Sequence, residues 1–227
     1  MGWKDKLTLL HCIASDLEAI HSQNLIHRDL HSGNILQDNI HSAYIADLGL
    51  VISTKMEHKG VYGVLPYVAP EVLTGRPYTK AFDIYSFGMI MWEVLYGKPA
   101  FYDETFGSEL QSRIILHDLR PPILEDTESC YVDLMKLCWA KEPEKRPSSA
   151  KILETLKEWQ NDKEILAKLT KSNIKINQIF QTINKKNVYS NESYRNQFIS
   201  YINLESRLNR SEDNSLIIFR SEEYLSV

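Results

Sequence analysis

The sequence predicts a mostly α-helical domain over residues 1–159, followed by a polar tail over residues 160–227. Three observations lead to this prediction. Apolar residues recur at three- and four-residue steps in residues 5–22 and 131–140, which is the spacing of one buried helix face. The segment 83–97 is apolar nearly all round, as in a helix that other helices enclose. Asn, Lys, Ser and Glu dominate from residue 160 onward.

The composition is that of an ordinary globular protein. The 227 residues include 43% hydrophobic and 25% charged residues, and the formal net charge is −4. A charge this small gives no reason to expect a nucleic acid or an anionic membrane as a partner. Because no run of about 18 apolar residues occurs, no transmembrane helix is expected. The N-terminus also lacks the apolar segment of a secretory signal.

The cysteines indicate the compartment. The sequence contains an odd number of cysteines, and none lies in a C-x-x-C pair: Cys12, Cys130 and Cys138. Disulfides or a zinc site are therefore not expected, and a reducing intracellular setting, cytoplasmic or also nuclear, fits better. We expect all three side chains to be small buried members of the core.

In chain order, the first predicted element is an amphipathic helix over residues 5–22, which contains no Pro or Gly. Residues 23–36 follow as a loop with short extended pieces, and residues 43–46 are a short strand candidate. A loop with two glycines and a proline covers residues 50–68. These short elements precede the main helical part of the domain.

Further helices are expected at 83–97, 110–116 and 131–140, each ended by Gly or Pro signals. At about 14 residues the apolar segment 83–97 is too short to cross a bilayer, so it predicts a helix inside the domain. Ser148 is a plausible N-cap for a last helix that ends near Trp159.

The tail contains one helical pattern, near residues 163–184. Apolar residues and one asparagine alternate steps of three and four: Leu166, Leu169, Asn173, Ile176, Phe180 and Ile183. The seam is shorter than the three to four heptads typical of a coiled coil. Two alternatives stay open, a helix packed on the preceding domain, which we favour, and weak self-association through this helix. Beyond residue 187 we expect mostly disorder.

One stretch, residues 26–36, carries the candidate chemistry. It places the carboxylate of Asp29 five residues before the amide of Asn34, and Asp47 follows thirteen residues later. Phosphoryl transfer needs such a set, because one carboxylate orients the attacking hydroxyl while an amide oxygen and a second carboxylate hold Mg²⁺ on the ATP phosphates. Asp29 and Asn34 are therefore the candidate catalytic residues, and Asn34 and Asp47 the candidate magnesium ligands.

This stretch resembles the catalytic loop of a protein kinase, H-R-D-L-x-x-x-N, and Asp-Leu-Gly at 47–49 resembles the D-F-G of the same family. Three more family motifs follow in order: A-P-E at 69–71, D-x-W-S-x-G at 83–88 with Tyr85 in place of Trp, and C-W-x-x-x-P-x-x-R-P at 138–147. The whole run most resembles the tyrosine-kinase-like kinases, a type expanded in some fungi.

The resemblance implies the fold of a kinase C-lobe, which is helical with a short β-hairpin at the catalytic loop. It implies ATP and Mg²⁺ as cofactors, Leu36 as the apolar floor under adenine, and a protein hydroxyl of Ser, Thr or Tyr as the phosphate acceptor. Glu71 and Arg146 would form a structural ion pair. Asp83 would hydrogen-bond the backbone of the catalytic loop.

The resemblance also implies roles for the two residues before Asp29. His27 would be a buried packing residue. Arg28 would neutralise a phosphate on the activation segment, residues 50–68, where Ser53, Thr54 and Tyr62 are the candidate acceptors.

The sequence departs from the family in three ways. The resemblance covers about residues 3–159, which corresponds to the C-lobe alone, and no Gly-rich loop, V-A-I-K lysine or glutamate partner is present. His31 and Val64 stand where Ser/Thr kinases carry Lys and Thr. We therefore expect a kinase-family protein that is inactive or weak by itself, and whether it is an enzyme stays open. The alternative is a non-catalytic pseudokinase fragment that acts as a protein-binding module.

Overall fold

The computed structural model describes residues 1–39, 42–54, 61–183 and 197–200, and these residues are mostly helical, as predicted. The helices are α1 (Trp3–Ser22), α2 (Pro70–Leu73), α3 (Lys80–Tyr96), α4 (Ser108–Leu116), α5 (Ser129–Cys138), α6 (Ser149–Asn161) and α7 (Lys163–Ile183). The strands are β1 (Leu25–Ile26), β2 (Ile35–Asn39), β3 (Ser42–Ile45), β4 (Ile52–Ser53), β5 (Val61–Gly63) and β6 (Gln197–Ile199). Across the described ranges, no helix is both long enough and apolar enough to span a membrane.

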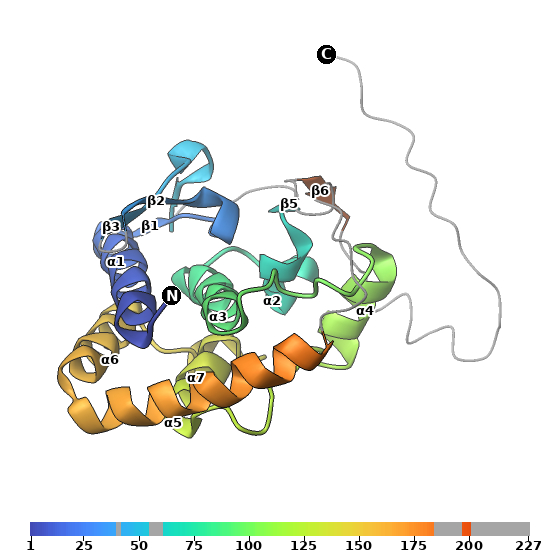
Figure 1. The fold of residues 1–227 in the computed structure, drawn as a ribbon. Coiled ribbons are helices and arrows are strands. Elements are labelled where there is room, and N and C mark those ends of the chain that lie inside the picture. The colour runs from blue at the N-terminus through green and yellow to red at the C-terminus, as the bar shows by residue number, and fades with distance from the viewer. Residues whose placement is uncertain (40–41, 55–60, 184–196, 201–227) are drawn as a thin grey trace, which may run out of the picture.

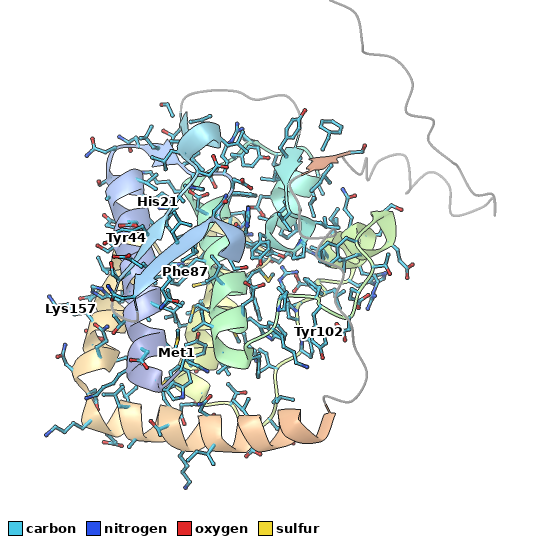
Figure 2. All side chains as sticks on the ribbon, turned by 45° about the horizontal axis from the view of Figure 1, so that its top comes forward. Met1, His21, Tyr44, Phe87, Tyr102 and Lys157 are labelled. Atoms are coloured by element: carbon cyan, nitrogen blue, oxygen red, sulfur yellow. The ribbon has the colours of Figure 1, made fainter. Side chains whose placement is uncertain are left out.

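The helix α3 is the centre of the fold. Most of its residues are buried, and Phe82, Tyr85, Phe87 and Trp92 are among the largest fully buried side chains. Figure 1 shows α3 between α1 and α2, and Figure 2 shows Phe87 among the side chains that fill the interior. Because the sequence of α3 has no polar face, this helix was expected to be enclosed by other elements.

The predicted helix ends differ from the observed ones by a few residues. The segment expected to begin at residue 83 begins at Lys80, because Thr79 is the extended N-cap residue, with φ −133° and ψ 169°. The cap expected at Ser148 is confirmed, since its side chain accepts a hydrogen bond of 3.2 Å from the Lys151 amide.

The helix α7 packs on the domain, as the favoured alternative predicted. Leu169 and Ile176 are buried, and Lys6 of α1 donates a hydrogen bond of 3.1 Å to Oδ1 of Asn173. Figure 1 shows α7 lying across one end of the helices. The side chains of Phe180 and Ile183 lie outside the described residues, and self-association through residues 163–184 stays a prediction.

The tail contains a strand that sequence reasoning missed. Residues 197–199 form β6, which pairs with β5 in an antiparallel two-stranded sheet. A strand of only three residues is too short to show a periodic pattern, and its partner lies more than a hundred positions earlier in the chain. The rest of the disorder expected beyond residue 187 lies outside the described residues.

The cysteine prediction is wrong for two of the three residues. None of the three forms a disulfide, but only Cys138 is buried, while Cys12 and Cys130 are half-buried. Burial raises the pKa of the Cys138 and Cys130 thiols above the ordinary value. The apolar neighbours in the sequence indicated helix faces correctly, but they did not indicate how deep each face lies.

Candidate active site

The candidate catalytic loop is fixed to the central helix by Asp83. This residue is fully buried, and its two carboxylate oxygens accept hydrogen bonds of 2.8 Å from the His27 amide and 2.9 Å from the Arg28 amide. Since these two amides directly precede Asp29, the core itself sets the position of the candidate base. The role that the sequence implied for Asp83 is confirmed, and His27 is fully buried, as expected.

A network of hydrogen-bonded side chains lies beneath the same loop. The ring of His21, labelled in Figure 2, places Nε2 2.9 Å from Asp83 and Nδ1 3.0 Å from the Ser149 hydroxyl. The hydroxyl of Ser149 donates its only proton to Glu18, at 2.6 Å. The network joins α1, α3 and α6 beneath the loop.

Asp29 and Asn34 are in direct contact. Nδ2 of Asn34 donates to the backbone oxygen of Asp29 at 2.9 Å and to its Oδ2 at 3.0 Å. The amide oxygen of Asn34 takes no part in these two bonds. The five-residue spacing read from the sequence thus brings a carboxylate and an amide together, with an oxygen ligand left for a cation.

Asp47 lies at the end of the hairpin formed by β2 and β3. Its backbone is left-handed, with φ 57°, and its Oδ1 accepts a hydrogen bond of 3.2 Å from the Gly49 amide. One residue earlier, the Ala46 amide donates to the backbone oxygen of Asn34 at 2.8 Å. The hairpin therefore brings two oxygen-bearing side chains to neighbouring backbone positions, and such ligands fit Mg²⁺.

Apolar side chains are exposed beside this hairpin. Leu36 and Tyr44 are cross-strand partners, and they are 59% and 53% exposed. Leu48, next to Asp47, is 60% exposed. An apolar side chain this exposed is open to a ligand or a partner, and the role of Leu36 as the floor under adenine stays a prediction.

His31 contributes to the site in a way that the sequence did not predict. Its Nε2 lies 3.7 Å from Oδ1 of Asp29, and its Nδ1 accepts a hydrogen bond of 3.1 Å from the Gly33 amide. Because Nδ1 is an acceptor, a ring proton on Nε2 would face Asp29. Sequence reasoning treated His31 only as the loss of a lysine, although its place two residues after Asp29 was the available signal.

A second hydrogen-bonded chain ties the loop to α3. Tyr67 donates to Oε1 of Glu93 at 2.6 Å, and the Ser32 hydroxyl lies 3.0 Å from the Tyr67 oxygen. Since the Tyr67 proton points to Glu93, Ser32 is the donor in the second bond. Burial raises the pKa of the Glu93 carboxyl, although the hydrogen bonds from Tyr67 and from the Ala100 amide oppose this effect.

Arg28 is a buried cation with unused donors. Its backbone is left-handed, with φ 70°, and its guanidinium lies 5.0 Å from the ring centroid of Tyr78. Nε and Nη1 are buried without a hydrogen-bond partner among the described residues. Ser53 pairs with Leu25 of β1, the strand that leads toward Arg28. The phosphate partner that the resemblance implied for Arg28 stays a prediction.

The ion pair implied by the sequence is confirmed. Arg146 binds Glu71 through two bonds, Nη1 to Oε1 at 2.7 Å and Nη2 to Oε2 at 2.8 Å. Both side chains are buried, at 0% and 5% exposure. Arg146 also donates to the backbone oxygens of Ala140 and Ala81, each at 2.9 Å. The pair therefore joins α2, at the end of the activation segment, to the turn before α6.

Comparison with known proteins agrees with this geometry. The sequence profile of the protein kinase domain matches residues 4–159. The chain is 33% identical over 149 residues to the serine/threonine/tyrosine-protein kinase HT1 of Arabidopsis thaliana, covering 65% of this chain and 38% of that protein. It is 34% identical over 160 residues to the serine/threonine-protein kinase fray1 of Dictyostelium discoideum, covering 65% and 27%.

A third relative is the RGS domain-containing serine/threonine-protein kinase A of Dictyostelium discoideum, 33% identical over 145 residues, covering 63% of this chain and 13% of that protein. The chain thus spans less than half the length of these curated relatives. With the profile matching more than half of its residues, the chain belongs to the protein kinase family.

Proposed function

We propose that this chain supplies the catalytic loop of a protein kinase domain of the tyrosine-kinase-like type, which transfers a phosphoryl group from Mg-ATP to a protein hydroxyl of Ser, Thr or Tyr. The observation that carries the proposal is the joint geometry of Asp29, Asn34 and Asp47. The Asn34 amide is bonded to Asp29, and the residue before Asp47 is bonded to Asn34.

Each residue has a separate task in this proposal. Bound Mg-ATP supplies the transferable phosphoryl group and the positive charge that neutralises it. Asp29 accepts a hydrogen bond from the substrate hydroxyl and orients it for attack. Asn34 and Asp47 would hold the metal through their side-chain oxygen atoms, and Leu36 would support the adenine ring. Asp83 is a positioning residue, because it acts through the amides before Asp29.

Active kinases also use a Lys–Glu pair and a Gly-rich loop that covers the phosphates. The described residues supply neither of these groups. We therefore infer that this chain by itself transfers phosphate weakly or not at all, and that full activity belongs to a complete kinase domain.

Calorimetric titration of the purified chain with Mg-ATP tests the proposal. We expect binding in the micromolar range, with an affinity about tenfold lower in Asp47→Asn, because one charged metal ligand is lost. Asp38→Asn is the matched control, since Asp38 is an exposed carboxylate on the same hairpin. Equal affinities of the two variants would remove Asp47 from its assigned role.

The exposed apolar side chains of Leu36, Tyr44 and Leu48 favour a second candidate function. A non-catalytic protein could use this surface as a binding module for a partner protein. The same titration discriminates the two functions. Micromolar binding of Mg-ATP contradicts the binding module, whereas the absence of heat at millimolar nucleotide favours it.

A further inference from the structure

The tail strand β6 lies on the activation segment. The register pairs Val61 with Ile199, Tyr62 with Phe198 and Gly63 with Gln197. Figure 1 shows β5 and β6 side by side. Among the described residues β5 has no other strand partner. A segment from far along the chain therefore covers an edge that would otherwise present unpaired backbone groups.

The side chains of the two strands match on both faces of this small sheet. Residues opposite each other in an antiparallel pair point to the same face. On the inner face, Val61 and Ile199 are 0% and 6% exposed, and both belong to the main hydrophobic core. On the outer face, the rings of Tyr62 and Phe198 pack edge to face with their centroids 5.3 Å apart.

A third contact anchors the residue after β6. Nε2 of Gln111, a buried side chain on α4, donates a hydrogen bond of 2.7 Å to the backbone oxygen of Ser200. The tail is thus held by strand pairing, by one buried aliphatic side chain and by one buried amide. These contacts come from β5 and α4, two elements on the same side of the molecule (Figure 1).

The strand β5 borders the candidate catalytic carboxylate. A Cβ atom placed on Gly63 would lie 3.9 Å from Oδ1 of Asp29, and Asp29 is only 4% exposed. Gln197 is the partner of Gly63, and paired strands lie about 4.8 Å apart. The backbone of the tail therefore passes within about 10 Å of the Asp29 carboxylate.

We propose that residues 197–200 form an autoinhibitory strand, which occupies in cis the edge of β5 that an extended segment of a protein substrate would pair with. The proposal rests on the proposed function of Asp29. The competing ligand is a peptide in the β conformation with an apolar residue at the position of Ile199. Because the tail is tethered, it competes at an effective concentration on the order of millimolar.

Hydrogen exchange on the full chain tests the pairing without any need for catalysis. In Ile199→Asp, a charge replaces a buried side chain, and we expect the amides of residues 61–63 to exchange about tenfold faster or more. Ser200→Asp is the matched control, because it adds the same charge at an adjacent exposed side chain. Unchanged exchange at residues 61–63 in Ile199→Asp, or equal acceleration in both variants, would overturn the proposal.

A second variant tests the same pairing without changing a core residue, in case Ile199→Asp does not fold. Phe198 is 59% exposed, so Phe198→Asp removes the contact with Tyr62 without touching the core. We expect it to accelerate exchange at residues 61–63 in the same direction, about two- to threefold, with exchange in α3 unchanged. No acceleration in either variant, with α3 still protected, would contradict the pairing in solution.

Competition is tested with a labelled peptide that carries the sequence of residues 195–201. We expect it to bind Ile199→Asp about tenfold tighter than the unmodified chain, because the tethered competitor is gone. Equal affinities would overturn the competition. Where the preparation transfers phosphate, Ile199→Asp should raise kcat/KM for a protein substrate by a similar factor. Hydrogen exchange and peptide binding do not depend on phosphoryl transfer. The autoinhibitory strand can therefore be refuted independently of the proposed kinase function.

Discussion

The buried ion pair between Glu71 and Arg146 gives the sharpest prediction for stability. Glu71→Gln removes the negative charge and turns an amide N–H₂ group toward the guanidinium, which leaves a buried cation without its counterion. Breaking a pair of this kind costs about 3–5 kcal/mol of the free energy of unfolding. The bonds from Arg146 to the backbone oxygens of Ala140 and Ala81 remain, so we expect a value near the lower end.

Urea unfolding followed by tryptophan fluorescence measures this change, and the melting temperature should fall by about 10 °C. The control is Glu154→Gln. Glu154 contacts Lys151 at 2.6 Å, but both side chains are more than half exposed, so no measurable change is expected. A loss of less than about 1 kcal/mol for Glu71→Gln, or equal losses for the two variants, would refute the reasoning.

The double variant Glu71→Leu with Arg146→Met sharpens the interpretation. Apolar residues of similar volume often replace a buried ion pair at little cost, because the desolvation penalty disappears along with the attraction. We expect the double variant to be more stable than Glu71→Gln. A double variant as unstable as the single one would show that packing around the pair, rather than the stranded charge, determines the loss.

Two further predictions concern the core. Burial lowers the pKa of Lys6 to about 8, below the value of about 10.4 for an unfolded chain, so the unfolded state binds more protons between these values. Lys6 alone therefore contributes a rise of at most about 3 kcal/mol in the free energy of unfolding between pH 8 and 10.4, while the buried thiols and phenols, whose pKa values are raised, contribute in the opposite direction. Urea titrations should therefore show the free energy of unfolding of Lys4→Met, an exposed control, rising over this range relative to that of Lys6→Met. In Gly88→Ala, the added Cβ would lie 2.9 Å from Cβ of Cys138, so the free energy of unfolding should fall by about 1–3 kcal/mol. Thermal melts measure this loss, and an unchanged melting temperature would contradict the close packing of α3 on α5.

The helical part of the fold was predictable because its signals are local. Three- and four-residue steps indicated α1, α5 and α7, the N-cap residue Ser148 indicated α6, and the apolar segment around Phe87 indicated a central helix. The site candidates Asp29 and Asn34 were also predictable, since five residues of loop suffice to bring the two side chains into contact.

What the sequence could not predict depends on contacts between distant segments. The position of His31 beside Asp29 follows from the shape of the loop, and no residue pattern encodes that shape. The strand β6 has only three residues, so its pairing with β5 is determined by a buried position for Ile199 rather than by local preference. The depth of Cys12 and Cys130 likewise depends on what packs over each helix face.

The most direct test of the central claim is transfer of labelled phosphate from Mg-ATP to a protein substrate, measured for the purified chain and for Asp29→Asn. Where the chain transfers phosphate, we predict weak, magnesium-dependent transfer that falls by about 100-fold or more in the variant, because the group that orients the hydroxyl is lost. Asp38→Asn, on the neighbouring hairpin, should keep the original rate. Measurable transfer at equal rates for the unmodified chain and Asp29→Asn would contradict the role assigned to Asp29.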